Sequence, residues 1–481
     1  MSVIILVADG ARPDSLSRAI DDGALPALAR LRAEGGLFTV TSAFPSVTGP
    51  AYAPFVMGRF PGPVGLPGLR WFDRARTRRT FPDRTRSYVG AEMRHVDGDL
   101  DADAPTLFEL VGSADGTDGA TGSVAALNVI GRGLRPADVV ARSARWALRA
   151  ARTHFRGDVG GWLEIDREVG REIARRVREQ RPAVTFAAFT GADKTSHSEG
   201  HEAPLVLDAL RIVDETAALL RDDAERDGRW EDTQLWVVSD HGHSPVHEHE
   251  DLAELVASWG HRVLSHPWVY RVRRPDVAVM VSGNAMAHLY LEPALRERPW
   301  WPALGDDHGA LVERLLARAS VDLMLLPHSP TRCEVRSGAR GVAMVEVSAT
   351  DMGATRYSYV PVTGDPLGVG ALDRVDSTEA HAATMDSDYP DAVVQIAHLA
   401  GAARSGEIIL SAARGWDFRA RYEPIPHVSS HGALHREHML VPLLLNRPPA
   451  RVPLRTTDVM PSALAALGLE VPEGLDGESF V

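Results

Sequence analysis

The stretch SVIILVADGARPD, residues 2–14, decides the fold class of this chain. Its first part, Ser2–Ala8, is apolar and rich in β-branched side chains, which is typical of a parallel strand buried on both faces. Asp9 and Gly10 follow at once. Ligands of open α/β sheets bind beyond the carboxyl ends of the strands. Asp9 is therefore a candidate ligand-binding side chain.

Further segments continue this pattern along the chain. Two apolar runs, Val184–Thr190 and Gln234–Ser239, predict buried strands, and Pro204–Ala224 between them has apolar residues at helical spacing. Strands that alternate with helices indicate a mostly parallel sheet sandwiched by helices. Val441–Leu445 predicts another strand, and Pro442 favours an edge position for it, because proline cannot donate to the ladder.

The chain is long enough for more than one domain, with 481 residues. Residues 266–395 contain strand-like pieces and a predicted helix at His308–Arg318, and they interrupt the alternating pattern. We expect them to form an inserted, smaller α+β cap domain, while residues 1–265 and 396–481 form the core. Residues 60–105 are rich in Pro, Gly, Arg and Asp, and we expect loops over the site there.

Composition excludes several classes of protein. The net charge of −13, from 52 basic and 65 acidic residues, argues against binding to a nucleic-acid polymer or an anionic membrane. One cysteine, Cys333, excludes a disulfide within the chain and a thiolate metal cluster. No apolar run reaches the roughly 18–20 residues that span a bilayer. Val3–Ala8 is too short for a signal-peptide core, so we expect a cytoplasmic protein.

Carboxylates and imidazoles recur in small clusters, most of them just after an apolar run. The clusters are Asp9, Asp193 with His197, Asp240 with His241, and His431. Residues four apart lie on one face of a helix, so Asp193 and His197 could reach one cation. Asp and His without Cys suit Zn²⁺ or Mn²⁺. Two such ions about 4 Å apart could clamp a phosphoryl group.

Thr48, in FPSVTGP, is the candidate nucleophile. A threonine hydroxyl is inert at its ordinary pKa, so a metal must hold it as the alkoxide. Gly49 leaves the backbone open to an incoming phosphate, and Pro50 could begin a helix whose N-terminus faces that phosphate. Ser46 is the rival nucleophile, and a helix N-cap is the ordinary structural role for Thr48.

These motifs, taken in order, resemble the alkaline phosphatase superfamily and, within it, the type I phosphodiesterase/nucleotide pyrophosphatase branch. The similarity rests on D-G-A-R at 9–12, F-P-S-V-T at 44–48, D-x-x-x-H at 193–197, S-D-H-G at 239–242 and H-G at 431–432. It implies an alkaline phosphatase-like α/β core and cleavage of phosphodiesters, pyrophosphates or phosphonates.

The resemblance also implies the roles of individual residues. One zinc ion would be held by Asp193, His197 and His431. The other would be held by Asp9, Asp240, His241 and the Thr48 oxygen. Thr48 would form a covalent phospho-threonine that water hydrolyses. The expected partners are small-molecule phosphate esters or pyrophosphates.

Leu69 departs from the branch, which has an asparagine donor to a phosphate oxygen at this position. Losing an oxyanion donor typically lowers the rate by about 10²–10³-fold. Candidate replacements and substrate contacts are Gly49, Arg12, Lys194, Arg70 and Arg74, with Trp71 stacking on the leaving group. Leu69 also favours a non-catalytic metal-binding sensor. A phosphomonoesterase or a phosphotransferase/mutase is a further alternative.

His243 extends the motif to S-D-H-G-H and forms a local histidine cluster with His247 and His249. We interpret the three as residues that support a ligand or lie on the surface, rather than as a third metal site.

Overall fold

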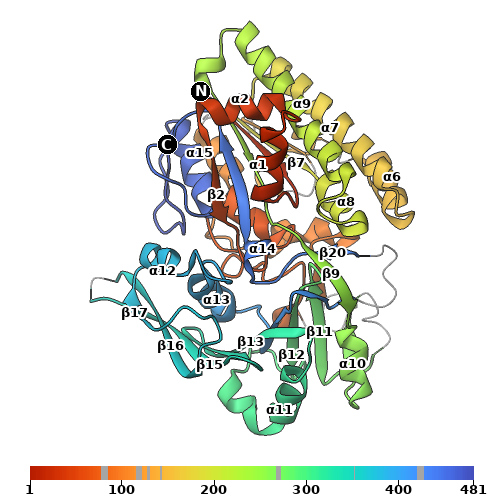
Figure 1. The fold of residues 1–481 in the computed structure, drawn as a ribbon, viewed down its shortest axis with the longest axis vertical. Helices are drawn as coiled ribbons and strands as arrows, with labels where there is room; N and C mark the ends of the chain where they lie inside the picture. Colours follow the sequence, from red (N-terminus) through yellow and green to blue (C-terminus); the bar gives the residue numbers. More distant parts are fainter. Residues whose placement is uncertain are drawn as a thin grey trace.

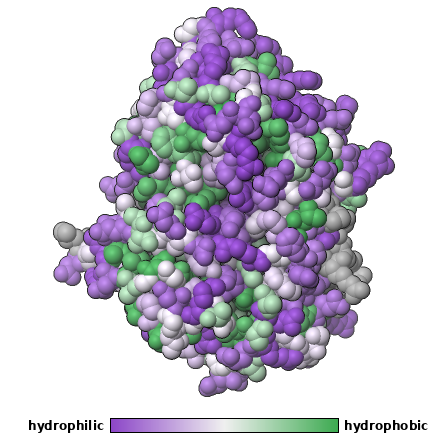
Figure 2. All heavy atoms as spheres, viewed as in Figure 1, coloured by the Kyte–Doolittle hydropathy of each residue, from purple (hydrophilic) through white to green (hydrophobic). Residues whose placement is uncertain are grey.

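The computed structural model describes residues 1–76, 85–114, 122–126, 130–140, 143–266, 272–351, 353–419 and 427–481. Within these residues the strands form two large sheets, of seven and nine strands, which we call the core sheet and the second sheet. Figure 1 shows the core sheet with its helices in the upper half, where both termini lie, and the second sheet below. The face seen in Figure 2 is mainly hydrophilic, with small hydrophobic patches, as expected when the apolar side chains are buried inside.

The core sheet has the order β2-β21-β8-β1-β7-β5-β6. Its central strand β1 pairs in parallel with β7 on one side and β8 on the other. The strand bounds are β1 Ser2–Ala8, β2 Gly36–Thr41, β5 Ser123–Ala126, β6 Val139–Val140, β7 Val184–Phe189, β8 Thr233–Val238 and β21 Leu440–Leu445. The predicted parallel arrangement of the first strand with its two neighbours is confirmed.

Both faces of β1 are buried, because alternate residues enter different hydrophobic clusters. Val3, Ile5 and Val7 belong to one cluster, and Ile4 and Leu6 to the other. The first cluster is covered by α3 (Ala53–Met57), α5 (Leu107–Ala114) and α15 (Val459–Ala466). The second is covered by α1 (Pro13–Asp21), α2 (Pro26–Glu34), α7 (Val159–Gln180) and α9 (Pro204–Arg226), with α6 (Ala144–Phe155) outside α7.

The expected edge position of Val441–Leu445 is wrong, because β21 lies between β2 and β8. β8 ends at Val238, which pairs with Leu443. Pro442 therefore lies opposite Ser239 at the very end of the ladder with β8, where its missing N–H removes at most one terminal bond. Its carbonyl still accepts a hydrogen bond from the Ser239 N–H at 3.2 Å. The proline is tolerated in an inner strand for this reason.

The second sheet is mostly antiparallel, with the order β10-β11-β12-β18-β13-β14-β15-β16-β17. Its strands are β10 Val263–Ser265, β11 Val277–Ser282, β12 Met286–Leu291, β13 Val321–Ser329, β14 Arg332–Ser337, β15 Gly341–Ala349, β16 Thr355–Gly364, β17 Leu372–Val375 and β18 Ile408–Ala412. One face packs on α10 (Leu252–Ser258) and α11 (Trp301–Leu316), and the other on α12 (Ser377–Thr384) and α13 (Ala392–Gly401).

The predicted helix at His308–Arg318 corresponds to α11. The domain boundaries at 265/266 and 395/396 stay a prediction. Residues 60–105, where they are described, contain short elements such as β3 (Arg70–Phe72) and β4 (Thr85–Ser87). No helix in the described part of the chain is long and apolar enough to cross a membrane.

A buried ion pair joins the helices of the second sheet to the end of the core. The Arg455 guanidinium binds both carboxylate oxygens of Asp391, at 2.7 and 2.6 Å, and also donates to the Ser377 carbonyl at 2.8 Å. Both partners are almost inaccessible, with 6% and 0% of their side chains exposed. Removing one member of such a pair leaves the other as a buried unpaired charge.

We therefore expect Arg455→Met to lower the free energy of unfolding by about 3–5 kcal/mol in urea denaturation. The matched control is Arg332→Met, which removes an ion pair to Glu346 whose two side chains are 53% and 44% exposed. That change should cost about 0–1 kcal/mol. Equal effects of the two substitutions would contradict the importance of the buried pair.

Candidate metal centre

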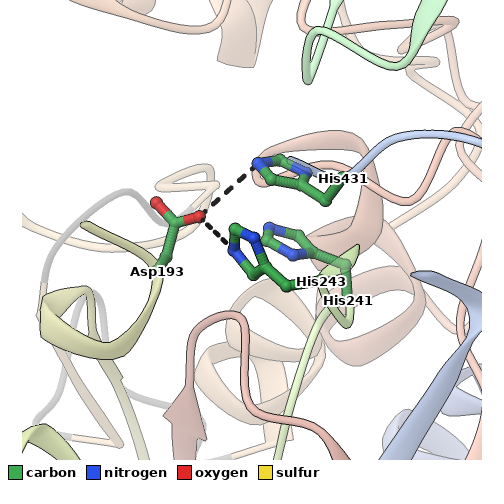
Figure 3. A group of neighbouring side chains, drawn as sticks. All are labelled: Asp193, His241, His243 and His431. Atoms are coloured by element: carbon green, nitrogen blue, oxygen red, sulfur yellow. Dashed lines mark hydrogen bonds and ion pairs between the residues drawn. The ribbon is translucent and has the colours of Figure 1, made fainter. Parts of the chain in front are cut away.

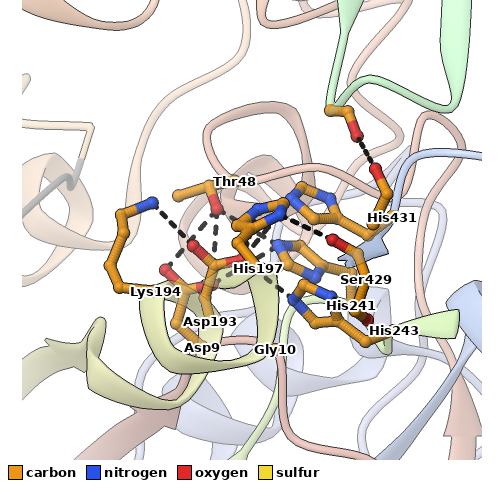
Figure 4. A network of polar contacts seen from close by, with 12 residues as sticks. Asp9, Gly10, Thr48, Asp193, Lys194, His197, His241, His243, Ser429 and His431 are labelled. Atoms are coloured by element: carbon orange, nitrogen blue, oxygen red, sulfur yellow. Dashed lines mark hydrogen bonds and ion pairs between the residues drawn. The ribbon is translucent and has the colours of Figure 1, made fainter. Parts of the chain in front are cut away.

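Three carboxylates lie just beyond the carboxyl ends of three adjacent strands. Asp9 follows β1 directly, and Asp240 follows β8 after one residue. Asp193 lies in the first turn of α8 (Gly191–Glu199), which begins directly after Thr190 at the end of β7. Since β8, β1 and β7 are neighbours in the sheet, their ends bring the three side chains together. Figure 4 shows two of them, Asp9 and Asp193.

The first cluster, which we call the Asp9 group, consists of Asp9, Thr48, Asp240 and His241. Thr48 Oγ1 is 3.3 Å from Asp9 Oδ1 and 3.2 Å from His241 Nε2. His241 Nε2 is also 3.3 Å from Asp9 Oδ1 and 3.4 Å from Asp240 Oδ2. The three buried residues Asp9, Asp240 and His241 each offer a ligand atom, and these atoms lie within 4.8 Å of one another.

The second cluster, the Asp193 group, consists of Asp193, His197, His243 and His431, and His241 borders it, because ligand atoms of Asp193, His241, His243 and His431 lie within 4.8 Å of one another. Asp193 Oδ1 is 3.1 Å from His197 Nε2, 3.0 Å from His243 Nε2 and 3.5 Å from His431 Nε2. Figure 3 shows the contacts with His243 and His431. The rings of His241 and His431 are stacked at a centroid distance of 3.6 Å, so the two groups adjoin each other. The predicted ligands thus come together in one place.

Backbone acceptors orient three of the imidazoles. Nδ1 of His197 is 3.0 Å from the Ser429 carbonyl, Nδ1 of His431 is 3.0 Å from the Ser46 carbonyl, and Nδ1 of His241 is 3.2 Å from the Gly242 carbonyl. A carbonyl only accepts, so each Nδ1 carries a hydrogen, and each Nε2 presents a lone pair when its ring is neutral. These lone pairs face carboxylate oxygens, which is the arrangement of a metal site whose histidines are held by their second nitrogen.

The electrostatics of the buried carboxylates also favour a cation. Burial raises the pKa of Asp9, and the charges of Asp240 and Asp193 raise it further. Burial raises the pKa of Asp240 as well, against the lowering effect of His241. Burial opposes ionisation of Asp193 too, but Lys194 and His197 outweigh it and hold the pKa of Asp193 well below its ordinary value. Within the described residues, the buried Asp240 Oδ2 accepts no hydrogen bond. The donor set therefore fits divalent metal ions.

The loop that carries Thr48 is fixed on both sides of the hydroxyl. Ser46 Oγ donates to the Ala433 carbonyl at 2.9 Å, and the Ser46 carbonyl accepts from His431. Gly49 has a φ of +100°, and a Cβ there would meet the Tyr88 ring at 2.5 Å, so only glycine fits. The hydroxyl of Ser46 is therefore engaged with the backbone, whereas that of Thr48 faces Asp9 and His241.

The proposed substrate contacts lie in different environments. Lys194 Nζ is 2.6 Å from Asp193 Oδ2, with 27% of its side chain exposed. Arg12 forms an ion pair with Asp14 and donates to the His243 carbonyl at 2.8 Å. Two other residues are buried: Arg74 pairs with Glu407 at 2.7 Å, and Trp71 packs inside the first hydrophobic cluster of the core. Their roles in substrate binding stay predictions.

His243 is the residue whose place the sequence analysis left open. It is fully buried in the Asp193 group, so its placement on the surface is wrong, whereas His247 and His249 are exposed on β9 (Ser244–His249). Burial lowers the pKa of His243 to about 3. His243 lies two residues after His241, but residues 241–243 belong to no helix or strand, so no periodicity in the sequence indicated that both side chains enter the site.

The comparisons with known proteins agree with this geometry. The family described as type I phosphodiesterase / nucleotide pyrophosphatase matches residues 3–297, more than half of the 481 residues, and the chain belongs to this family. The family indicates a phosphoester hydrolase. No curated protein sequence matches the chain closely enough to count as a relative.

Solved structures of similar fold cover nearly the whole chain. Phosphonoacetate hydrolase from Sinorhizobium meliloti 1021, in complex with phosphonoformate, has a TM-score of 0.58 at 17% identity, over 97% of this chain and 96% of that one. Murine ectonucleotide pyrophosphatase / phosphodiesterase 5 has a TM-score of 0.56 at 15% identity, over 99% and 98%. The human protein of that name has a TM-score of 0.56 at 14% identity, over 99% and 97%. The alkaline phosphatase-like fold predicted from the sequence is confirmed.

The raised pKa of Asp9 predicts a pH-dependent stability of the metal-free protein. The folded chain holds a proton on Asp9 more tightly than the unfolded chain, whose pKa is near 3.8. The protonated Asp9 side chain therefore stabilises the folded state fully below that value, and this contribution is lost as the pH rises through the raised pKa. The measurement is urea denaturation of the wild type and of Asp9→Asn in EDTA at a series of pH values. The free energy of unfolding of the wild type minus that of the variant should fall as the pH rises above about 4. A difference that is constant with pH would contradict this assignment.

Proposed function

We propose that this chain is a two-metal hydrolase that cleaves phosphodiester, pyrophosphate or phosphonate bonds, with Thr48 as the nucleophile. The observation that carries the proposal is the position of Thr48 Oγ1, within 3.5 Å of Asp9 and His241 and next to the Asp193 group. An exposed threonine elsewhere would have no means of losing its proton.

Two sets of side chains would hold the ions, which we propose to be Zn²⁺, with Mn²⁺ as the alternative. Asp193, His197 and His431 would hold one ion, and Asp9, Asp240, His241 and Thr48 Oγ1 the other. When bound, such ions neutralise the carboxylates, lower the pKa of a nearby hydroxyl and stabilise charge on a phosphoryl group.

Thr48 would act in two displacement steps. In the first, Thr48 Oγ1 forms a bond to phosphorus, the bond from phosphorus to the leaving group breaks, and the hydroxyl proton ends on the leaving group. In the second, a water oxygen replaces Thr48 Oγ1 on phosphorus and a proton returns to Thr48. The chain prepares the first step by holding the loop through Ser46, so that the hydroxyl needs no reorganisation before attack.

Lys194 is the side chain that we propose to replace the missing asparagine donor. The Leu69 N–H donates a hydrogen bond to Ser282 Oγ at 3.0 Å, and the Leu69 side chain packs against the core. Lys194 instead extends from α8 beside Asp193, is partly exposed and carries a positive charge. A cation at that place can bind a phosphate oxygen as charge develops on it.

Small-molecule phosphate esters, pyrophosphates and phosphonates are the substrates that we propose. The structures of similar fold include a hydrolase in complex with phosphonoformate and an inactive form of the murine protein in complex with AMP. The net charge of −13 makes a nucleic-acid polymer a poor partner. The choice of metal and the cytoplasmic location stay predictions.

The experiment is a comparison of two single variants on a panel of diester, pyrophosphate, phosphonate and monoester substrates with added Zn²⁺ or Mn²⁺. Thr48→Ala should lower kcat by more than about 10³-fold, because it removes the attacking atom. Ser46→Ala removes only a hydrogen bond to Ala433, so it should lower kcat by less than about tenfold.

Two outcomes would overturn the proposal. Activity that survives Thr48→Ala but not Ser46→Ala would make Ser46 the nucleophile. Absence of turnover on every substrate, from wild-type protein that has bound its metals, would favour the non-catalytic sensor that Leu69 suggested.

A further inference from the structure

We propose that four protein side chains, rather than three, hold the ion of the Asp193 group, and that His243 is the fourth ligand beside Asp193, His197 and His431. The inference rests on the proposed function only in requiring that a divalent ion binds there. It assigns to His243 a role that the resemblance to the family does not imply.

The three imidazoles surround one carboxylate oxygen symmetrically. The ring centroids of His197, His243 and His431 are 4.9, 5.0 and 5.1 Å apart, close to an equilateral triangle. Asp193 Oδ1 lies 3.0 to 3.5 Å from the Nε2 atom of each ring. Two ligand atoms bound to one tetrahedral zinc ion at about 2.0–2.1 Å lie about 3.3 Å apart. The observed separations match that spacing for His243 as well as for the two predicted histidines.

Hydrogen bonding is compatible with the His243 tautomer that a ligand needs. Ser429 Oγ reaches the Ser244 carbonyl at 3.0 Å, and with its hydrogen directed there it accepts from His243 Nδ1 at 3.2 Å. In that tautomer the Nε2 lone pair faces Asp193 Oδ1 at 3.0 Å, and a cation would bind both atoms. In the other tautomer Nε2 donates a hydrogen bond to Asp193, and binding of the ion would displace that proton.

The sequence around Asp9 supports His243 in this position. A Cβ on Gly10 would lie 3.0 Å from His243 Cδ2 and Nε2, so glycine makes the room that the imidazole fills. Arg12 donates to the His243 carbonyl at 2.8 Å and holds its backbone. The D-G-A-R motif therefore supplies both a ligand of the Asp9 group and the support of His243.

A fourth protein ligand makes the two sites different. Zinc sites with four protein ligands are typical of structural sites, whereas catalytic sites keep a position open. We expect the ion of the Asp193 group to bind more tightly and to exchange more slowly than the ion of the Asp9 group, whose fourth ligand is the reacting Thr48 hydroxyl.

The test begins with zinc affinity, measured by competition with a chelator. His243→Gln should weaken one of the two zinc sites by more than about 100-fold, beyond the 10–100-fold that residues supporting a ligand usually cause. Ser429→Ala, which removes the hydroxyl beside His243 Nδ1 and its bond to the Ser244 carbonyl but no ligand atom, should stay within that range. His247→Gln, on the exposed side of β9, is the matched control and should leave both affinities unchanged. Circular dichroism and thermal unfolding of the metal-free variants show whether each remains folded.

A crystal structure of the zinc-loaded wild type gives a second measurement that does not depend on any variant. The proposal expects anomalous density with His243 Nε2 about 2.0–2.1 Å from the ion. An ion in the Asp193 group with His243 Nε2 more than about 3 Å away, or with His241 in its place, would overturn this inference and leave the proposed function standing. Failure of the wild type to bind zinc at either group would instead overturn the proposed function itself.

Discussion

The mutual repulsion of three buried carboxylates is the constraint on which the rest of this structure depends. Asp9, Asp193 and Asp240 lie at the ends of adjacent parallel strands, and burial gives none of them water to disperse its charge. The raised pKa values of Asp9 and Asp240 express that cost. Neutral imidazoles whose lone pairs face the carboxylates add to this repulsion, and a pair of divalent cations would turn it into attraction.

The surroundings of the site hold these groups in place from both sheets. The Asp9 and Asp240 side chains come from the core sheet, but the segment of His431 is held by the second sheet. The His431 carbonyl accepts from the Ala285 N–H at 3.0 Å, and Ser430 Oγ donates to the Gly283 carbonyl at 3.0 Å. On the other side, Gln395 of α13 binds the backbone of Ser42 and Phe44, which leads to Thr48. The site therefore depends on how the two sheets pack together.

The sequence was most informative where burial on both faces left a continuous apolar run. β1, β7 and β8 could be predicted for that reason. The carboxylates that follow them could then be predicted as site residues, because they lie at the ends of these strands. β21 could not be placed, because the effect of Pro442 depends on where a distant strand ends. His243 could not be assigned, because tertiary packing sets the direction of a side chain in a segment that belongs to no helix or strand. In β16 of the second sheet, burial alternates only over the first half of the strand, so its period carries less information.

The zinc content of the purified, dialysed wild-type protein, measured by mass spectrometry, tests the central claim most directly. If the clustered carboxylates and imidazoles exist to hold cations, each chain should retain two zinc ions after saturation and removal of the excess. Protein that is folded yet retains no zinc would show that the repulsion is relieved by protons alone, and the account of a metal-dependent hydrolase would fail.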